Sequence, residues 1–185
     1  MNVTDVNNRV SAIDDERIAK IEKEIEKLKR DKITSNVYTA PTPNITQSSE
    51  LNSNFAGYKA FNNVQVDISS LNNAWLSTAE DTSPWLAYEF DKLVHFEKID
   101  IEYANNSDTV THTFKIQGSK DGIDYVDLET ITLEFERSVI KTDIIPIESD
   151  ETYKFLRIQG SEPNYGGVNL YACAFSQVTI YATVD

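Results

Sequence analysis

The sequence contains few of the side chains on which metal binding, redox chemistry and catalysis depend. Among 185 residues there are two histidines and one cysteine, Cys173, so no disulfide forms within the chain. We interpret Cys173 as a small buried hydrophobic residue. No cluster of Cys and His has metal-ligand spacing, and no Gly-rich phosphate-binding loop is present. Carboxylates are abundant, but no pattern among them indicates a hydrolase, and we expect no enzymatic activity.

Long apolar runs are also missing. No segment approaches the roughly 18 consecutive apolar residues that a membrane-spanning helix needs. The first residues, Met-Asn-Val-Thr-Asp-Val, contain no apolar core of a secretory signal. We therefore expect synthesis in a cytoplasm and no insertion into a membrane.

Positive charge is scarce. The chain has 17 Lys and Arg residues against 30 Asp and Glu residues, which gives a net charge of −13. Residues 1–32 are neutral overall, with eight acidic and eight basic side chains, so the excess lies in residues 33–185. This balance argues strongly against nucleic acid, whose phosphates need cationic partners. It also disfavours anionic membranes and favours neutral or cationic partners.

A helical pattern runs from Ser11 to Lys32. Ser11 and Asp14 fit a capping box, with further acidic residues near the start and basic residues near the end. Large apolar residues follow the 3-4-3 spacing of heptad positions a and d: Ile18, Ile21, Ile25 and Leu28. The flanking g and e positions hold opposite charges: Arg17 with Glu22, and Glu24 with Lys29.

This spacing predicts a parallel coiled coil that joins copies of the chain. Ile at both a and d favours three strands over two, although Leu28 weakens the preference and leaves a dimer open. A helix of about 19 residues is marginal when isolated. The alternative is an amphipathic helix that packs on its own domain.

The segment before the heptads is separate in pattern. Its apolar residues are out of phase with the later ones, because five positions separate Ile13 from Ile18. After the helix, the prolines at 41 and 43 block regular pairing. We divide the chain into an anchoring segment that docks into a larger assembly, an oligomerisation helix, a linker and a β domain: 1–13, 14–33, 34–40 and 41–185.

Beyond the linker, alternating apolar and polar residues predict antiparallel strands without helices longer than a turn. The candidates are 84–90, 93–103, 111–118, 123–133, 138–146, 152–160 and 172–183. Between two of them, Asp121-Gly122 supplies the positive φ that a tight hairpin turn requires. Several short strands at this spacing predict an all-β fold built as a β-sandwich.

Seven segments of the β domain carry a family pattern. They are Ile45-Thr46-Gln47-Ser48-Ser49, Tyr58-Lys59-Ala60-Phe61-Asn62-Asn63, Trp75-Leu76-Ser77, Pro84-Trp85-Leu86-Ala87-Tyr88-Glu89-Phe90-Asp91, Gln117-Gly118-Ser119-Lys120-Asp121-Gly122, Tyr153-Lys154-Phe155-Leu156-Arg157-Ile158 and Val178-Thr179-Ile180-Tyr181. Together, over about residues 40–183, they resemble the discoidin, or coagulation factor V/VIII C-type, domains. That family belongs to the galactose-binding-like jelly rolls.

The resemblance implies non-catalytic recognition by loops at one end of the sandwich, most often of carbohydrate. Relatives also bind phospholipid or protein, so the fold does not fix the ligand. Family members often hold a structural calcium ion, but here the two expected carboxylates are the amides Asn62 and Gln177. Asp67 is a possible substitute ligand. We expect no cofactor and no resident metal, with calcium as the alternative.

In sugar-binding relatives the contacts come from the loop before the Phe114 strand and from the last long loop. Such sites combine an aromatic face with amide, His, Arg or acidic groups. The candidate ligand-binding residues are Asn105, Asn106, His112, Asn164, Tyr165 and Asn169. Asn is also an ordinary turn former, and Tyr165 has the alternative of folding back over the sandwich edge. Residues 52–55 are a third, weaker candidate.

Other conspicuous side chains are interpreted as structural: Trp75 and Trp85 as core residues, Arg157 as a strand residue, and His95 as a strand residue that faces solvent.

The sequence supports two hypotheses about function. The first is a homotrimeric carbohydrate-binding protein that attaches to host surface glycans. The second is a structural or decoration protein that uses the sandwich for protein contacts. A coiled coil followed by a sandwich is similar to bacteriophage head or tail fibres. We therefore expect a virion location, with residues 1–13 bound to other virion proteins; an exported adhesin is the alternative.

Overall fold

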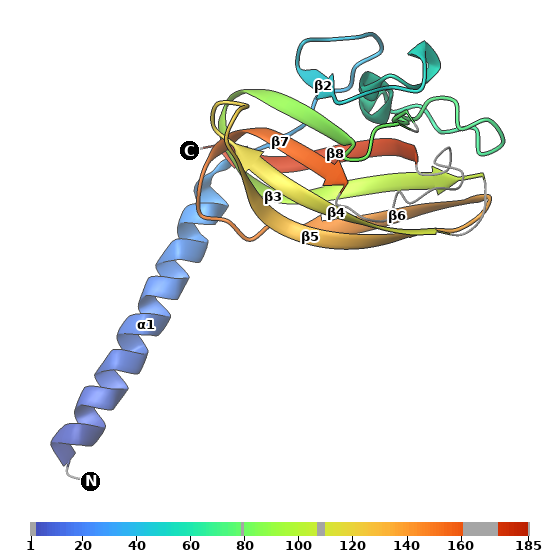
Figure 1. Cartoon of the computed structure of the whole chain (residues 1–185). Helices are drawn as coiled ribbons and strands as arrows, with labels where there is room; N and C mark the ends of the chain where they lie inside the picture. The colour runs from blue at the N-terminus through green and yellow to red at the C-terminus, as the bar shows by residue number, and fades with distance from the viewer. Residues whose placement is uncertain (1–2, 79, 107–109, 161–173, 185) are drawn as a thin grey trace.

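Figure 1 shows a computed structural model in which a long helix projects from one end of a two-layer β-sandwich. The structure describes residues 3–78, 80–106, 110–160 and 174–184. No helix in these ranges is long and apolar enough to cross a membrane.

Helix α1 runs from Val3 to Lys29 without interruption. It therefore begins eleven residues before the predicted start of the oligomerisation helix at residue 14, within the range expected to form the separate segment 1–13. The anchoring role of 1–13 stays a prediction. The predicted helix end at residue 33 is wrong, because Asp31–Thr34 forms strand β1 and pairs antiparallel with the last strand. This pairing satisfies the backbone groups of what is otherwise an open sheet edge.

The predicted linker 34–40 is also held against the sandwich. The backbone N–H of Ser35 donates to the Ile180 carbonyl over 2.9 Å, and its hydroxyl accepts the Ile180 N–H over 3.0 Å. Three residues further on, Tyr38 N–H donates to the Phe61 carbonyl. The boundary between stalk and sandwich therefore lies at Arg30, the single residue between α1 and β1.

The remaining strands and two short 3-10 helices follow in chain order. Their bounds are β2 Ile45–Gln47, η1 Ser53–Phe55, η2 Gly57–Phe61, β3 Trp85–Asn105, β4 Val110–Ser119, β5 Tyr125–Phe135, β6 Val139–Pro146, β7 Tyr153–Gly160 and β8 Ala174–Val184. One layer contains β2, β3, β7, β4 and β5. The other contains β1, β8, β3 and β6. All these strand pairs are antiparallel, which confirms the predicted all-β sandwich.

Strand β3 is one strand where the sequence predicted two, 84–90 and 93–103. Its first half pairs with β2 and β7, and its second half pairs with β8 and β6. The register shifts between Glu89 and Val94, where residues 91–93 are exposed. Such a bulge lets a strand bend from one layer to the other without breaking the ladder.

The core between the layers is rich in aromatic rings. Phe96 stacks on Tyr153 with centroids 5.9 Å apart, and Tyr103 lies against Phe135 at 4.7 Å. Trp75 is buried, as predicted, whereas Trp85 is only half-buried and lies outside the core. The predicted solvent exposure of His95 is wrong.

The imidazole of His95 is only 7% exposed. It lines a small cavity of about 160 Å³ together with Lys27 and Arg30 at the end of α1 and Thr183 of β8. The helix end covers a strand position that would otherwise face water. Local alternation could not reveal this cover, because the covering residues lie far away in the sequence.

The hairpin between β4 and β5 has the predicted turn. Gly122 adopts φ +77°, a value that glycine tolerates. The Asp121 carboxylate accepts the N–H groups of Ile123 and Asp124 over 2.8 and 3.0 Å. These bonds lower the pKa of Asp121.

One glycine of this hairpin is required by packing. A Cβ added to Gly118 would lie 2.7 Å from the ring of Tyr153, which is itself stacked on Phe96. We expect Gly118→Ala to lower the free energy of unfolding by about 1–3 kcal/mol, measured by urea denaturation. The control is Ile123→Ala in the same hairpin, whose side chain is 81% exposed and which should change stability by less than about 0.5 kcal/mol. Equal stabilities of the two variants would contradict the close packing.

Candidate functional site

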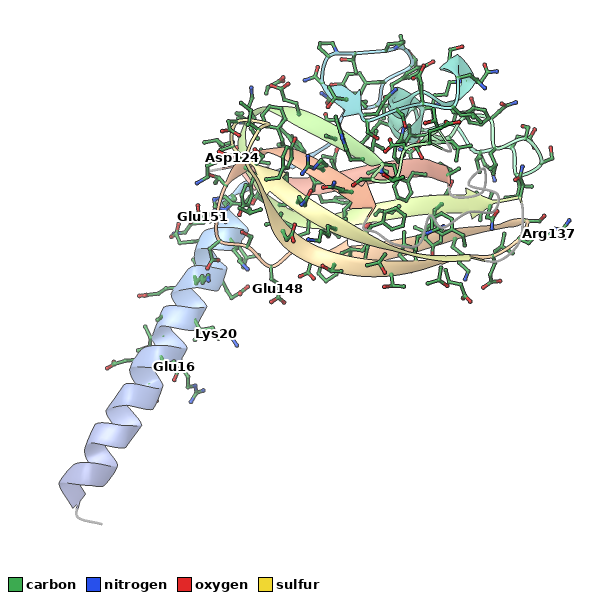
Figure 2. The ribbon with its side chains drawn as sticks, viewed as in Figure 1. Glu16, Lys20, Asp124, Arg137, Glu148 and Glu151 are labelled. Atoms are coloured by element: carbon green, nitrogen blue, oxygen red, sulfur yellow. The ribbon has the colours of Figure 1, made fainter. Side chains whose placement is uncertain are left out.

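Several loops meet at the end of the sandwich that lies away from α1. The register places Ala174 opposite Ala104, Val139 opposite Asn105, and Gly160 opposite Phe114. The β3–β4 connection, the β5–β6 turn and both ends of the β7–β8 connection therefore lie at one end. Figure 2 shows Arg137 of the β5–β6 turn at this end, and Asp124 and Glu151 at the opposite end, toward α1.

Two of the predicted ligand residues point into the scaffold beneath this end. Asn105 is completely buried, and its Nδ2 donates to the Phe135 carbonyl over 3.2 Å. Its own carbonyl accepts the Ser138 N–H over 2.7 Å. Asn105 therefore fastens the β5–β6 turn to β3 and presents no surface to a ligand.

His112 is 6% exposed and packs edge-on against Phe114 and Phe135, at centroid distances of 6.4 and 5.9 Å. Burial lowers the pKa of its imidazole. It belongs to the core of the loop end. The prediction went wrong at Asn105 and His112 because a polar loop sequence does not reveal which side chains turn inward.

Asn106 behaves differently from these two residues. It is half-buried at the surface, and its Nδ2 donates to the Ser69 carbonyl over 3.3 Å. It thereby links the β3–β4 loop to the 67–72 loop and remains a candidate ligand contact. The other three candidates, Asn164, Tyr165 and Asn169, lie outside the described residues, and their role stays a prediction.

A hydrogen-bonded platform joins the opening segment of the sandwich to residues 75–85. The Trp75 ring stacks on Phe175 at 5.7 Å, and its Nε1 donates to the Ser49 carbonyl over 3.0 Å. The hydroxyls of Ser48 and Ser49 both donate to the Asp81 carboxylate. The segment after β2 is therefore held rigidly.

Beside β2 the surface has a groove of about 540 Å³, hereafter the β2 groove. It is lined by Pro41, Thr42, Ile45, Thr46, Gln47, Glu50, Ser53, Ala56 and Tyr58. The Gln47 side chain is fixed in place: its Oε1 accepts the Gly57 N–H over 2.8 Å, and its Nε2 donates to Glu50. The half-buried ring of Tyr58 forms one apolar wall.

This groove combines an aromatic face with an amide, a carboxylate and hydroxyl groups. That combination suits a sugar ring, whose apolar face stacks on aromatics while its hydroxyls form hydrogen bonds. In the sequence, Gln47 and Tyr58 stand out only as members of the segments that resemble the discoidin family. The weaker candidate segment 52–55 reaches the groove through Ser53, whereas Phe55 is buried. The available signal was the closeness in sequence of Gln47, Glu50 and Tyr58.

The amides at the expected calcium position bind the backbone instead. Asn62 Oδ1 accepts the Val64 N–H over 2.8 Å, and Gln177 Oε1 accepts the Asn63 N–H over 2.9 Å. The carboxylate of Asp67 accepts hydrogen bonds from Ser69 and Ser70, and these lower its pKa. Within the described ranges no three His, Cys, Asp or Glu residues form a possible metal site. These donors do not fit a resident calcium ion.

The comparison with known proteins points in one direction. The model of the F5/8 type C domain family matches residues 44–173. No curated protein matches the chain.

Among solved structures, three similar ones are carbohydrate-binding modules. Chitosan-binding module 1 from a chitosanase/glucanase of Paenibacillus sp. IK-5 has 17% identity and a TM-score of 0.54, over 74% of this chain and 92% of that one. The family 32 module of C. perfringens NanJ, in complex with galactose, has 17% identity and a TM-score of 0.53, over 74% and 91%. CBM32-3 from a family 31 glycoside hydrolase of Clostridium perfringens has 15% identity and a TM-score of 0.52, over 80% and 90%. At these identities the likeness shows the fold alone.

The buried His112 predicts a pH dependence of stability. Its folded pKa is lower than the unfolded value of about 6.5, so the unfolded chain takes up the proton first. The free energy of unfolding should therefore be unaffected above about pH 6.5 and fall as the pH decreases below it, by at most about 1.4 kcal/mol per pH unit.

The measurement is urea denaturation between about pH 7 and pH 5, compared with His112→Gln, which should have a smaller slope. Carboxylates with lowered pKa, such as Asp121 and Asp127, lose their contribution only below about pH 4. An unchanged slope in His112→Gln would contradict the assignment.

Proposed function

The chain belongs to the F5/8 type C domain family, and on this basis we propose that it is a non-catalytic carbohydrate-binding module. The β2 groove carries the proposal, because it places the Tyr58 ring beside the fixed polar groups of Gln47 and Glu50. Such an arrangement binds a sugar without catalysing a reaction of the sugar. Asn106 and the predicted residues Asn164, Tyr165 and Asn169 form a second part of the proposal, at the loop end.

The charge of the sandwich restricts the class of glycan. Residues 33–185 carry the whole net charge of −13. Near the loop end, Tyr103 donates to Asp143 over 2.7 Å, and the neighbouring Glu134 and Glu136 both pair with Lys141, so acidic side chains outnumber basic ones in this cluster. We expect neutral or amine-bearing glycans as ligands, because anionic glycans are repelled by this field. Two similar modules support this choice: one is named for chitosan binding, and the other was solved in complex with galactose.

We further propose that the chain is a receptor-binding or fibre protein of a bacteriophage. A coiled-coil homotrimer displays the modules toward host surface glycans, and residues 1–13 dock to other virion proteins. The exposed stalk helix supports this form. The alternative, a decoration protein that uses the sandwich for protein contacts, gains if no glycan binds.

The test is calorimetric titration of the full chain with chitooligosaccharides, galactose-terminated oligosaccharides and sialylated oligosaccharides. Saturable binding of a neutral or amine-bearing sugar is expected. Tyr58→Ala should weaken it at least about ten-fold, equivalent to about 1.4 kcal/mol. Glu50→Gln should weaken it by a smaller factor, because one charged hydrogen-bond acceptor is lost.

The matched control is Tyr181→Ala, a half-buried tyrosine of β8 in the layer that does not contain β2, where its ring contacts Lys98 of the neighbouring strand β3. It should leave the affinity unchanged. Loss of binding in Tyr165→Ala but not in Tyr58→Ala would move the site to the loop end. Absence of binding to every glycan would refute the carbohydrate proposal.

A further inference from the structure

The stalk helix exposes a continuous apolar stripe. Residues 14–29 of α1 are all exposed, and the four large apolar side chains among them are open to water: Ile18 54%, Ile21 58%, Ile25 45% and Leu28 78%. Amphipathic helices of soluble proteins bury such a stripe. The alternative predicted from sequence, that this stripe packs on the chain's own sandwich, is therefore wrong.

A different face of α1 contacts the sandwich. Lys23 forms an ion pair with Asp150, and Lys27 and Arg30 line the cavity that contains His95. The pKa of Asp150 is lowered first by the hydrogen bond from Lys23 and then by the charges of Lys23, Lys27 and Arg30. These three basic residues therefore form the sandwich-facing side of the helix.

The two faces lie on opposite sides of α1. Successive residues of an α-helix are separated by about 100°, so positions 23, 27 and 30 lie together, about half a turn from positions 18, 21, 25 and 28. In heptad terms, Lys23 and Arg30 occupy position f and Lys27 occupies position c, which point away from partner helices. The sandwich is thus attached where a coiled coil leaves room for it.

The charges beside the stripe suit other copies of the same helix. In a parallel, in-register arrangement, Arg17 of one copy meets Glu22 of the next, and Glu24 meets Lys29. In the single chain Lys29 bonds to Glu26 over 2.8 Å, but both side chains are about two-thirds exposed. Exposed pairs of this kind contribute little and exchange readily.

From these observations, and resting on the proposed homotrimer, we infer which surfaces of the stalk meet. The stripe of Ile18, Ile21, Ile25 and Leu28 binds the same stripe of two further copies, in parallel and in register, while the opposite face of each helix carries its own sandwich on the outside. Each binding site is then built from one chain. The sites act independently, and avidity rather than cooperativity raises the apparent affinity.

Two cysteine variants test the faces, both in a Cys173→Ser background. Leu28→Cys, at position d, should form a disulfide between two chains under mild oxidation, because equivalent d positions adjoin in a parallel bundle. Lys20→Cys, at the outward position c, should not; Figure 2 labels Lys20 on the stalk. The inference is overturned if Lys20→Cys forms the disulfide and Leu28→Cys does not, or if neither variant forms one.

A second test needs no cysteine. Light scattering of the full chain should give three times the mass of the chain, and Ile21→Asp with Ile25→Asp should give the mass of one chain. The thermal transition of the sandwich should be retained in this double variant, because neither side chain contacts the sandwich. A monomeric or dimeric full chain, or a double variant that stays trimeric, overturns the inference.

Binding measurements separate this inference from the proposed function. The monomeric double variant should bind a soluble oligosaccharide with the same affinity as the full chain. It should bind a glycan-coated surface at least about 100-fold more weakly than the full chain does. If no glycan binds at all, the proposed function fails while the mass and disulfide results still decide the arrangement of the stalk. If the soluble affinity also falls in the double variant, the sites are not independent and the inference is overturned.

Discussion

The sandwich depends on β3, because this strand is part of both layers. Leu86 and Tyr88 in its first half and Ile99 and Ile101 in its second half all face the core. The shift of register after Glu89 lets the strand leave one layer and enter the other. The positions of β2, β7, β8 and β6 follow from this single strand, and so do the loops at its end. A one-residue shift in the register of β3 would move its core side chains to the opposite face of the sheet.

The segments around the site are held in place by side-chain hydrogen bonds. Asn62 and Gln177 bind backbone N–H groups of the 62–64 turn, in which Asn63 has φ +54°. Amides serve here because they accept hydrogen bonds without the repulsion that carboxylates would add to an already anionic domain. At the other side of the site, the hydroxyls of Ser48 and Ser49 bind Asp81 and hold the segment that leads into the β2 groove.

Alternation of residues predicted most strands, because β4, β5 and β7 each have one buried face. Strand β1 was missed, since four residues are too few to show a period of two. Strand β2 has only three residues, and it was indicated by the resemblance of Ile45–Ser49 to the family's opening strand rather than by alternation. The predicted site was recovered less well. Asn106 lies at the surface, but Asn105 and His112 point inward, and only tertiary packing decides between these outcomes. The β2 groove joins the irregular segment around Pro41 to the three-residue strand β2 and the short 3-10 helix that contains Tyr58, and elements this short show no periodicity from which to predict a surface.

The distribution of charge favours the proposed association of copies through the stalk. In the proposed trimer, three sandwiches that each carry a charge of −13 would repel one another, and this repulsion is screened only beyond about 8 Å at physiological ionic strength. Residues 1–32 carry no net charge, so their association meets no such opposition. In that trimer, attachment through Lys23, Lys27 and Arg30 would place each sandwich on the outer side of its helix, where the distance to its neighbours is greatest. Electrostatic repulsion and heptad geometry therefore favour the same arrangement, with the sandwiches separated from one another.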